Sequence, residues 1–321
     1  ENPEKAAISL SYGEGNIVKH QANKKLPLAS TLKVIIAIEY AYQAAEGKIS
    51  PSTKVSTSEL EKYYYANTDG GAHSRWKNSL GLADNDTCRL EEVAKGMIRY
   101  SSNANTEYLM DLLETENIND RIKKLGIEKH DSMYYLVSSL FIKDYLFPDK
   151  EGADALTALQ ELPAERYIDT CRGIHKKLKK GNFEYDDLED FSLEAQKIWS
   201  DRLPASTASE YRKLMEKLNA KELPQNVHKH LDPVLEFIME NPQNQSWLEH
   251  SGMKGGSTAS LLTKALYAKR KNGNKIAMSY FLTDLSYFEQ IQLSRSMNAF
   301  EIAVLQDAAY REKLDQLISD L

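Results

Sequence analysis

The chain has 321 residues, of which 41% are hydrophobic and 27% charged, and its formal net charge is -6. This is the composition of an ordinary globular protein, long enough for one large domain or two modest ones. The acidic balance argues against nucleic acid as the main partner, because phosphate binding needs a basic surface. The sequence also lacks the apolar run of roughly 18 residues that a membrane helix requires.

Both ends of the chain predict β-strands. Alternating patterns, turn residues at Gly13-Glu14-Gly15 and the hairpin signal Asn272-Gly273-Asn274 indicate where the strands turn. The predicted strands are 7–12, 16–20, 247–253, 263–271 and 275–283. The simplest arrangement joins them in one antiparallel sheet.

The middle of the chain predicts helices, because apolar residues recur at helical spacing. The predicted helices are 30–46, 90–100, 105–113, 119–125, 205–218 and, with a break, 287–317. Frequent Gly, Asn and Asp predict a long loop over 67–86. Residues 140–199 are charged and helix-prone, and predict an added helical layer in which Lys176, Lys177, Lys179 and Lys180 form a solvated face.

These elements predict an α+β fold with strands from both termini and helices between them. We expect residues 1–29 and 245–321 to form a sheet subdomain. Residues 30–244 would form a helical subdomain with an insertion at about 140–200, and both parts would act as one catalytic unit. Cys88 and Cys171 fit two unpaired thiols better than a disulfide framework.

The first motif with chemical meaning is Ser30-Thr31-Leu32-Lys33. A serine hydroxyl needs a neighbouring base, and Lys33 stands one helical turn beyond Ser30 on the same face. A helix start favours developing negative charge, and burial by the apolar flanks would lower the lysine pKa. The motif alone is weak. Ser30 could be an ordinary helix cap, and the pattern recurs at Ser74-Arg75-Trp76-Lys77.

Two further motifs follow in order along the chain. Ser101-Ser102-Asn103 lies at a predicted break between two helices, and Lys254-Gly255-Gly256-Ser257-Thr258 lies between two predicted strands. Glycine within a strand indicates close approach of a ligand or another backbone. Each motif has a plain alternative, a serine cap or a flexible turn. Similar patterns recur without a role, as at Ser296-Met297-Asn298.

The three motifs in this order resemble the serine β-lactamase and penicillin-binding superfamily, in particular its class A β-lactamase-like branch. The segments PLASTLK (27–33), YSSNANTEYL (100–109) and MKGGST (253–258) carry the resemblance. It implies a β-lactamase/transpeptidase-like fold over nearly the whole chain. It also implies a serine hydrolase without a metal or an organic cofactor.

The resemblance implies a role for each matched residue. Ser30 would be the acylated nucleophile, Lys33 its base, and Ser101 a proton relay to the leaving nitrogen. The backbone amides of Ser30 and Ser257 would form the oxyanion hole. Asn103, Lys254, Gly256 and Ser257 would bind the substrate, with Asn103 also touching Lys33.

The sequence departs from the family pattern at two places. Gly255 replaces the usual Ser or Thr of the third motif, so Ser257 or Thr258 would have to supply that hydroxyl. The class A pattern E-x-x-L-N, whose glutamate activates the deacylating water, is absent near 126–141. The nearest acids, Glu128, Asp144 and Asp149, do not fit it. The sequence therefore contains the residues that acylation of Ser30 needs, but no identifiable base to activate the water that would release the acyl group.

Three functions remain open from the sequence. The chain could be a β-lactamase-like hydrolase with slow turnover of β-lactam or related amide substrates, or a D-alanyl-D-alanine peptidase acting on cell-wall peptides. It could also be a penicillin-binding sensor that is acylated without turnover. The expected partner is a small-molecule substrate, and family habit predicts an extracellular or cell-envelope location. The Tyr63-Tyr64-Tyr65 run could line the cleft or form a buried cluster.

Overall fold

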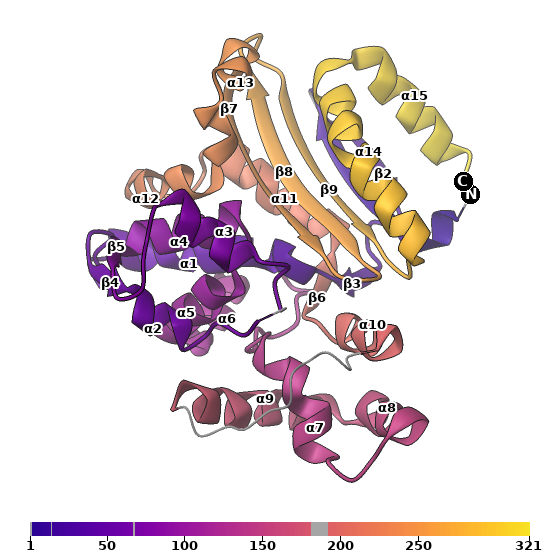
Figure 1. Ribbon diagram of the computed structural model, residues 1–321. Coiled ribbons are helices and arrows are strands. Elements are labelled where there is room, and N and C mark those ends of the chain that lie inside the picture. Colours follow the sequence, from indigo (N-terminus) through magenta and orange to yellow (C-terminus); the bar gives the residue numbers. More distant parts are fainter. Residues whose placement is uncertain (1, 14, 67, 181–191) are drawn as a thin grey trace.

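The computed structural model describes residues 2–13, 15–66, 68–180 and 192–321. It confirms the predicted α+β class (Figure 1). Strands from both ends of the chain form the main sheet, and the intervening chain is mostly helical.

The main sheet has five antiparallel strands in the order β2-β1-β9-β8-β7. The strands are β1 (Ala6–Tyr12), β2 (Asn16–His20), β7 (Leu248–Ser257), β8 (Leu262–Arg270) and β9 (Lys275–Leu282). Alternate residues of a strand face opposite sides of the sheet. Ala265 and Tyr267 accordingly lie in the larger hydrophobic core, whereas Leu266 lies in a second, smaller one. The sheet therefore needs apolar cover on both faces.

Helices supply this cover (Figure 1). α11 (Ala208–Asn219) packs against β1, β8 and β9 and contributes to the larger core. α14 (Tyr287–Gln306) packs on β8 and adds Val304 to the smaller core, and α15 (Ala308–Ser319) packs on β2. The predicted break in the last helix lies at Asp307, whose carboxylate caps α15.

Helix α1 (Lys33–Ala45) is the centre of the helical part and follows the short 3-10 helix η2 (Ala29–Leu32). Its neighbours are α4 (Leu90–Arg99), α5 (Asn103–Leu113), α6 (Thr115–Lys124) and α12 (Gln225–Leu235). Because the run Val34 to Ile38 is apolar on every side, α1 is enclosed almost completely. This burial carries Lys33, the first residue of α1, into the interior.

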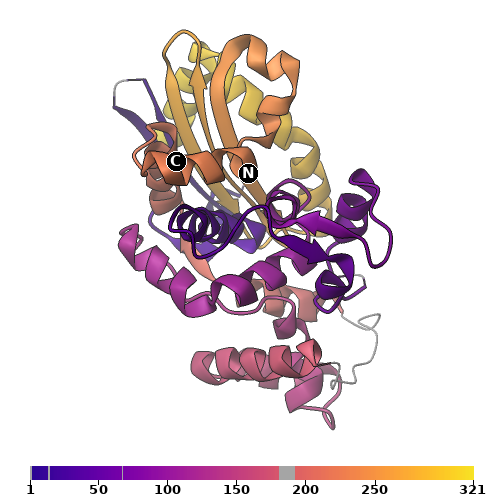
Figure 2. The same ribbon diagram turned by 90° about the vertical axis from the view of Figure 1, so that its left-hand side faces the viewer.

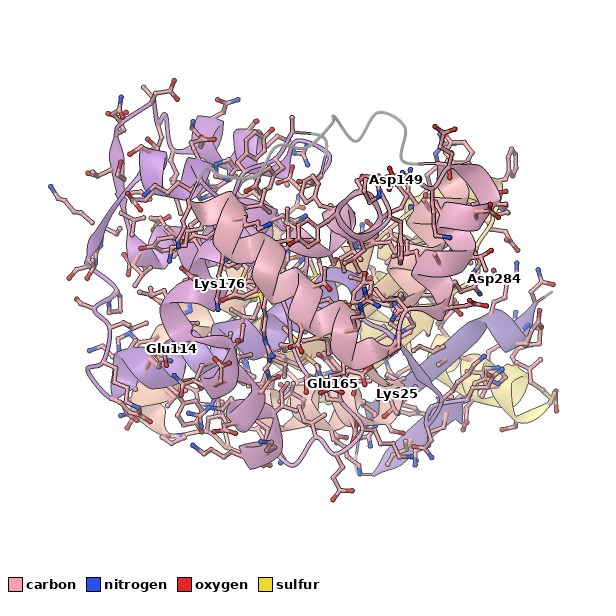
Figure 3. All side chains as sticks on the ribbon, turned by 90° about the horizontal axis from the view of Figure 1, so that it is seen from below. Lys25, Glu114, Asp149, Glu165, Lys176 and Asp284 are labelled. Carbon is pink, nitrogen blue, oxygen red and sulfur yellow. The ribbon has the colours of Figure 1, made fainter. Side chains whose placement is uncertain are left out.

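The predicted helical layer is present (Figures 1 and 2). Its elements are η3 (Ser138–Phe141), α7 (Ile142–Leu146), α8 (Gly152–Glu161), α9 (Ala164–Lys179) and α10 (Leu193–Asp201). Seen from below, α9 crosses the underside of the molecule between Glu165 and Lys176 (Figure 3). Lys176 and its lysine neighbours in 177–180 are exposed, as predicted, and residues 181–191 of the layer lie outside the described chain.

The smaller elements complete the fold. They are η1 (Pro3–Lys5), β3 (Lys25–Pro27), β4 (Lys54–Ser56), α2 (Thr57–Glu61), α3 (Ala72–Ser79), β5 (Thr87–Arg89), β6 (Ala205–Thr207), η5 (Phe237–Glu240) and α13 (Pro242–Trp247). Cys88 and Cys171 are buried free thiols, which confirms their predicted unpaired state.

Several sequence boundaries were wrong. The predicted loop 67–86 contains α3, which forms despite its polar sequence because the Trp76 side chain is buried. Residues 205–207 form β6, because they pair with β3 instead of starting α11. β7 extends to Ser257, so the third motif lies within a strand, and Asn103 begins α5 instead of preceding it. The division into two subdomains stays a prediction. α11, which the sequence assigned to the helical part, packs on the sheet.

Candidate active site

Ser30 lies at the turn that connects β3 to α1, on the wall of a cleft of about 630 Å³. The preceding residue, Ala29, has a φ of 44°, in the left-handed region that side chains other than glycine adopt at a cost. Leu28 fixes the approach, since its N–H donates to Pro204 O at 3.1 Å. The chain thus holds Ser30 at the cleft through a strained turn, as is common at functional sites.

Lys33 connects the first two motifs. Its side chain is fully buried, and Nζ donates to Ser101 O at 2.8 Å, to Ser101 Oγ at 3.2 Å and to Asn103 Oδ1 at 2.9 Å. The implied contact between Asn103 and Lys33 is therefore present. These three bonds fix the position of the amine one turn after Ser30.

Burial changes the chemistry of this lysine. Loss of solvation lowers the pKa of Lys33 to about 7, although the carboxylates of Asp69 and Glu107 act in the opposite direction. A lysine with this pKa is about half neutral at pH 7, and its neutral form accepts a proton. Lys33 therefore has the property that a base for Ser30 needs.

Ser101 lies between two lysines. Its φ of 66° turns the chain between α4 and α5, and its Oγ also accepts from Lys254 Nζ at 3.1 Å. Lys254 Nζ donates in addition to Gly255 O at 2.6 Å. Burial, then the charges of Lys33 and Lys264, lower the pKa of Lys254 well below its usual value. The second and third motifs thus meet at the Ser101 hydroxyl.

Gly256 brings the third motif against the first. A Cβ atom at this position would lie 2.5 Å from the Ser30 backbone nitrogen and 2.6 Å from Thr263 Oγ1, so only glycine fits. The Thr263 hydroxyl donates to Leu28 O at 2.8 Å and further fixes this junction. β7 therefore runs close beside the Ser30 turn, which is the arrangement that paired backbone amides of an oxyanion hole require.

Ser257 and Thr258 both line the cleft and are the candidates to replace the hydroxyl that Gly255 lacks. Thr258 Oγ1 already accepts from Ser200 Oγ at 2.8 Å. Ser257 is exposed and lines the cleft. Of the two residues that the sequence offered, Ser257 is the more available.

The opposite wall of the cleft is apolar and includes Leu136, Val137 and Leu140. Val137-Ser138-Ser139-Leu140-Phe141 keeps the leucine of the E-x-x-L-N pattern but has valine and phenylalanine at its glutamate and asparagine positions. Glu107 holds this segment, because its Oε1 accepts from Val137 N at 2.9 Å. The shared leucine was the sequence signal that could have located this segment.

The acidic residues that the sequence offered are not placed to act as the base. Glu128, Asp144 and Asp149 are exposed and do not line the cleft. Among the described residues, Asp69 is the one carboxylate on the cleft wall, and sequence reasoning missed it. Its oxygens accept the backbone N–H groups of Ala72 and His73, both at 3.0 Å, so it is engaged at the start of α3.

The other residues that the sequence suggested lie away from Ser30, Lys33 and Ser101. Ser74 and Lys77 of the repeated motif belong to α3 and do not line the cleft. Ser296-Met297-Asn298 belongs to α14, and of these three residues Met297 lines the cleft. Tyr63 and Tyr65 are buried, so the aromatic run forms a cluster and not a cleft wall. Within the described residues, no helix combines the length and apolar character needed to cross a bilayer.

Comparison with known proteins agrees with this geometry. A family model described as "Beta-lactamase enzyme family" matches residues 2–259. The chain therefore belongs to the beta-lactamase enzyme family, and together with the fold this defines a β-lactamase-like hydrolase. A search of curated proteins found no match.

Solved structures share the fold at low sequence identity. The TLA-3 extended-spectrum β-lactamase is 14% identical, with a TM-score of 0.55 over 88% of this chain and 85% of its own. PBP-A is 15% identical, with a TM-score of 0.53 over 92% and 89%. A leucine-to-glutamate variant of PBP-A, an acyl-enzyme complex with penicillin G, is 14% identical, with a TM-score of 0.52 over 92% and 90%.

Proposed function

We propose that this protein is a serine hydrolase that forms an acyl-enzyme at Ser30 with β-lactams or related amides and releases it slowly. The observation that carries the proposal is the position of Lys33. Its buried amine is held by Ser101 and Asn103, one turn from a serine at the cleft, and its pKa is about 7.

Acylation uses the residues around this amine. Neutral Lys33 accepts the proton of Ser30 as Oγ attacks the carbonyl carbon, and the carbonyl oxygen gains negative charge. The backbone amides of Ser30 and Ser257 stabilise that charge. The carbon–nitrogen bond then breaks, and Ser101 Oγ passes its proton to the leaving nitrogen while Lys33 returns to Ser101 the one proton that it took from Ser30. Lys254 stays hydrogen-bonded to Ser101 Oγ throughout. Asn103, Lys254, Gly256 and Ser257 orient the substrate.

Release of the acyl group needs an activated water. Among the described residues, the wall at Leu136, Val137 and Leu140 carries no carboxylate that could serve as a general base for water there. This favours an acyl-enzyme that accumulates over rapid hydrolysis. A second candidate function is a penicillin-binding peptidase or sensor, which the fold shared with PBP-A favours. Substrates derived from cell-wall peptides would place the protein outside the cytoplasm or in the cell envelope.

Labelling with a fluorescent penicillin tests the proposal. Wild type is expected to carry a covalent label that resists denaturation, and Ser30→Ala is expected to carry none. Ser74→Ala, in the repeated S-x-x-K motif, is the matched control and should label like wild type. Equal labelling of wild type and Ser30→Ala would remove Ser30 from the mechanism. Release of D-alanine from a D-Ala-D-Ala peptide would then distinguish the peptidase.

A further inference from the structure

A buried histidine joins the added helical layer to the helix that carries Asn103. His175 lies on α9, which runs below α5 in Figure 1. Its Nδ1 lies 3.3 Å from Glu107 Oε2 and its Nε2 lies 3.4 Å from Asp111 Oδ1, both within ion-pair distance. Glu107 and Asp111 are one turn apart, so they face the same side of α5. His175 therefore bridges two turns of this helix.

The same histidine contacts the apolar wall of the cleft. Its ring lies parallel to that of Tyr135, with 3.5 Å between the ring centroids, and Tyr135 directly precedes Leu136 and Val137 of the wall. Glu107 makes a second connection, because its Oε1 accepts from Val137 N at 2.9 Å. His175 itself does not line the cleft. Its effect on a bound substrate would therefore pass through Tyr135 and Glu107.

Charge holds this arrangement together. Burial lowers the pKa of His175, but the contacts with Asp111 and Glu107 outweigh burial and raise the pKa above its usual value. The protonated ring supplies the counter-charge that the buried Glu107 carboxylate needs. Asp111 has further partners in Lys179 and in the Tyr63 hydroxyl, which donates to it at 2.9 Å. Within the described part of the chain, loss of His175 therefore affects Glu107 more than Asp111.

We propose that His175 is a positioning residue for the reaction at Ser30, because it holds Glu107 and thereby the wall at Val137. The inference rests on the proposed function, since the wall faces the substrate that Ser30 attacks. A displaced Glu107 would also disturb the amine of Lys33, whose pKa burial lowers and Glu107 raises. The added layer thus influences the active site from outside the cleft.

Two pairs of substitutions test which carboxylate transmits the effect. His175→Gln leaves Glu107 without its counter-charge, and the rate constant for acylation by a fluorescent penicillin is expected to fall by about tenfold. Adding Glu107→Gln removes the uncompensated charge but keeps an oxygen for Val137 N, so the rate constant should return to within about threefold of wild type. Adding Asp111→Asn instead should leave it low. The two double variants are sufficient for the test if His175→Gln alone does not fold.

His228→Gln is the matched control. His228 is also buried, and its Nδ1 lies 2.9 Å from the Asp232 carboxylate, but both residues belong to α12 and neither lines the cleft. This variant loses a buried histidine–carboxylate pair away from the wall and should be acylated at the wild-type rate. A fall equal to that of His175→Gln would indicate a general loss of stability and would overturn the inference.

Trp199 reports the position of the wall without any reaction. It lines the cleft, and its Nε1 donates to Ser139 Oγ at 2.7 Å. In protein labelled with fluorotryptophan, the fluorine NMR resonance of Trp199 is assigned as the one that Trp199→Phe removes. This resonance should shift in His175→Gln, return when Glu107→Gln is added, and stay shifted when Asp111→Asn is added.

The two measurements separate this inference from the proposed function. The expected pattern of resonances without acylation of wild type would overturn the proposed function and leave the role of His175 standing. Acylation of wild type together with an unchanged rate constant and resonance in His175→Gln would overturn the inference alone. Rescue by Asp111→Asn instead of Glu107→Gln would do the same, because His175 would then act only by docking the layer.

Discussion

The two sides of the cleft are built differently. On one side, the start of α1, the turn between α4 and α5, and β7 bring Lys33, Ser101 and Lys254 into a set of hydrogen bonds beside Ser30. On the other side, η3 and α10 present Leu136, Val137, Leu140 and Trp199. Under the proposed mechanism the polar side has the groups that acylation requires, whereas the described residues of the apolar side include no carboxylate that could serve as the base for hydrolysis. The proposal therefore separates formation and release of an acyl-enzyme within one cleft.

Removal of the Lys33 amine should damage the polar side most. Lys33→Ala deletes the group that bonds Ser101 and Asn103, and we expect the acylation rate constant to fall by about 10²–10⁴-fold. Stopped-flow labelling with a fluorescent penicillin measures this. Lys77→Ala, from the repeated motif in α3, is the control and should retain the wild-type rate constant. A loss of less than tenfold would show that another group is the base.

Gly256→Ala tests the junction between β7 and the Ser30 turn. The new Cβ would lie 2.5 Å from Ser30 N, so the two backbone segments must separate. Because the oxyanion hole depends on their spacing, acylation should slow by about 10²-fold. Gly173→Ala, on α9 with open space around its Cβ position, should have no effect on the same assay. An unimpaired Gly256→Ala would exclude the proposed oxyanion hole.

The apolar side can be given the missing carboxylate. Val137→Glu places an acid on the cleft wall at the glutamate position of E-x-x-L-N, and we expect the acyl-enzyme to hydrolyse about 10²-fold faster. Decay of the penicillin adduct measures the change. Val137→Gln has similar size without a base and should keep the slow decay. Equal decay in both variants would show that a general base is not what limits release.

The pH dependence of acylation distinguishes the two sides further. Lys33 is a base only when neutral, and its pKa is about 7. The acylation rate constant should therefore rise about tenfold per pH unit below pH 7 and level off above it. Adduct decay, which does not use Lys33 in this account, should lack that transition. Measured melting temperatures across the same range show whether the fold is intact. A rate that still rises near pH 10 would mean an ordinary lysine pKa.

Sequence reasoning predicted the polar side better than the apolar side. Ser30, Lys33, Ser101 and Lys254 belong to short motifs with a fixed order, so their meeting could be predicted before their distances were known. The position of Asp69 on the cleft wall was missed, because the Gly-rich segment around it is typical of a loop. The neighbouring helix α3 forms through burial of Trp76. Secondary-structure propensity is a local property and does not predict such tertiary contacts.

The contact between α10 and the cleft was beyond sequence reasoning for a related reason. Trp199 meets Ser139, and Ser200 meets Thr258, across long separations in the chain. Pairing of β6 with β3 is equally non-local, so residues 205–207 were predicted as helix. Periodicity predicted that the layer is helical, but only the fold shows that it supplies a wall of the active-site cleft.

Intact-protein mass spectrometry after mixing with penicillin G tests the central claim most directly. The account predicts rapid gain of the mass of one whole penicillin, located at Ser30 by peptide mapping, and slow return to the unmodified mass. Ser30→Ala should show no gain. Rapid consumption of penicillin G by wild type without an accumulating adduct would contradict the claim that release is the impaired step.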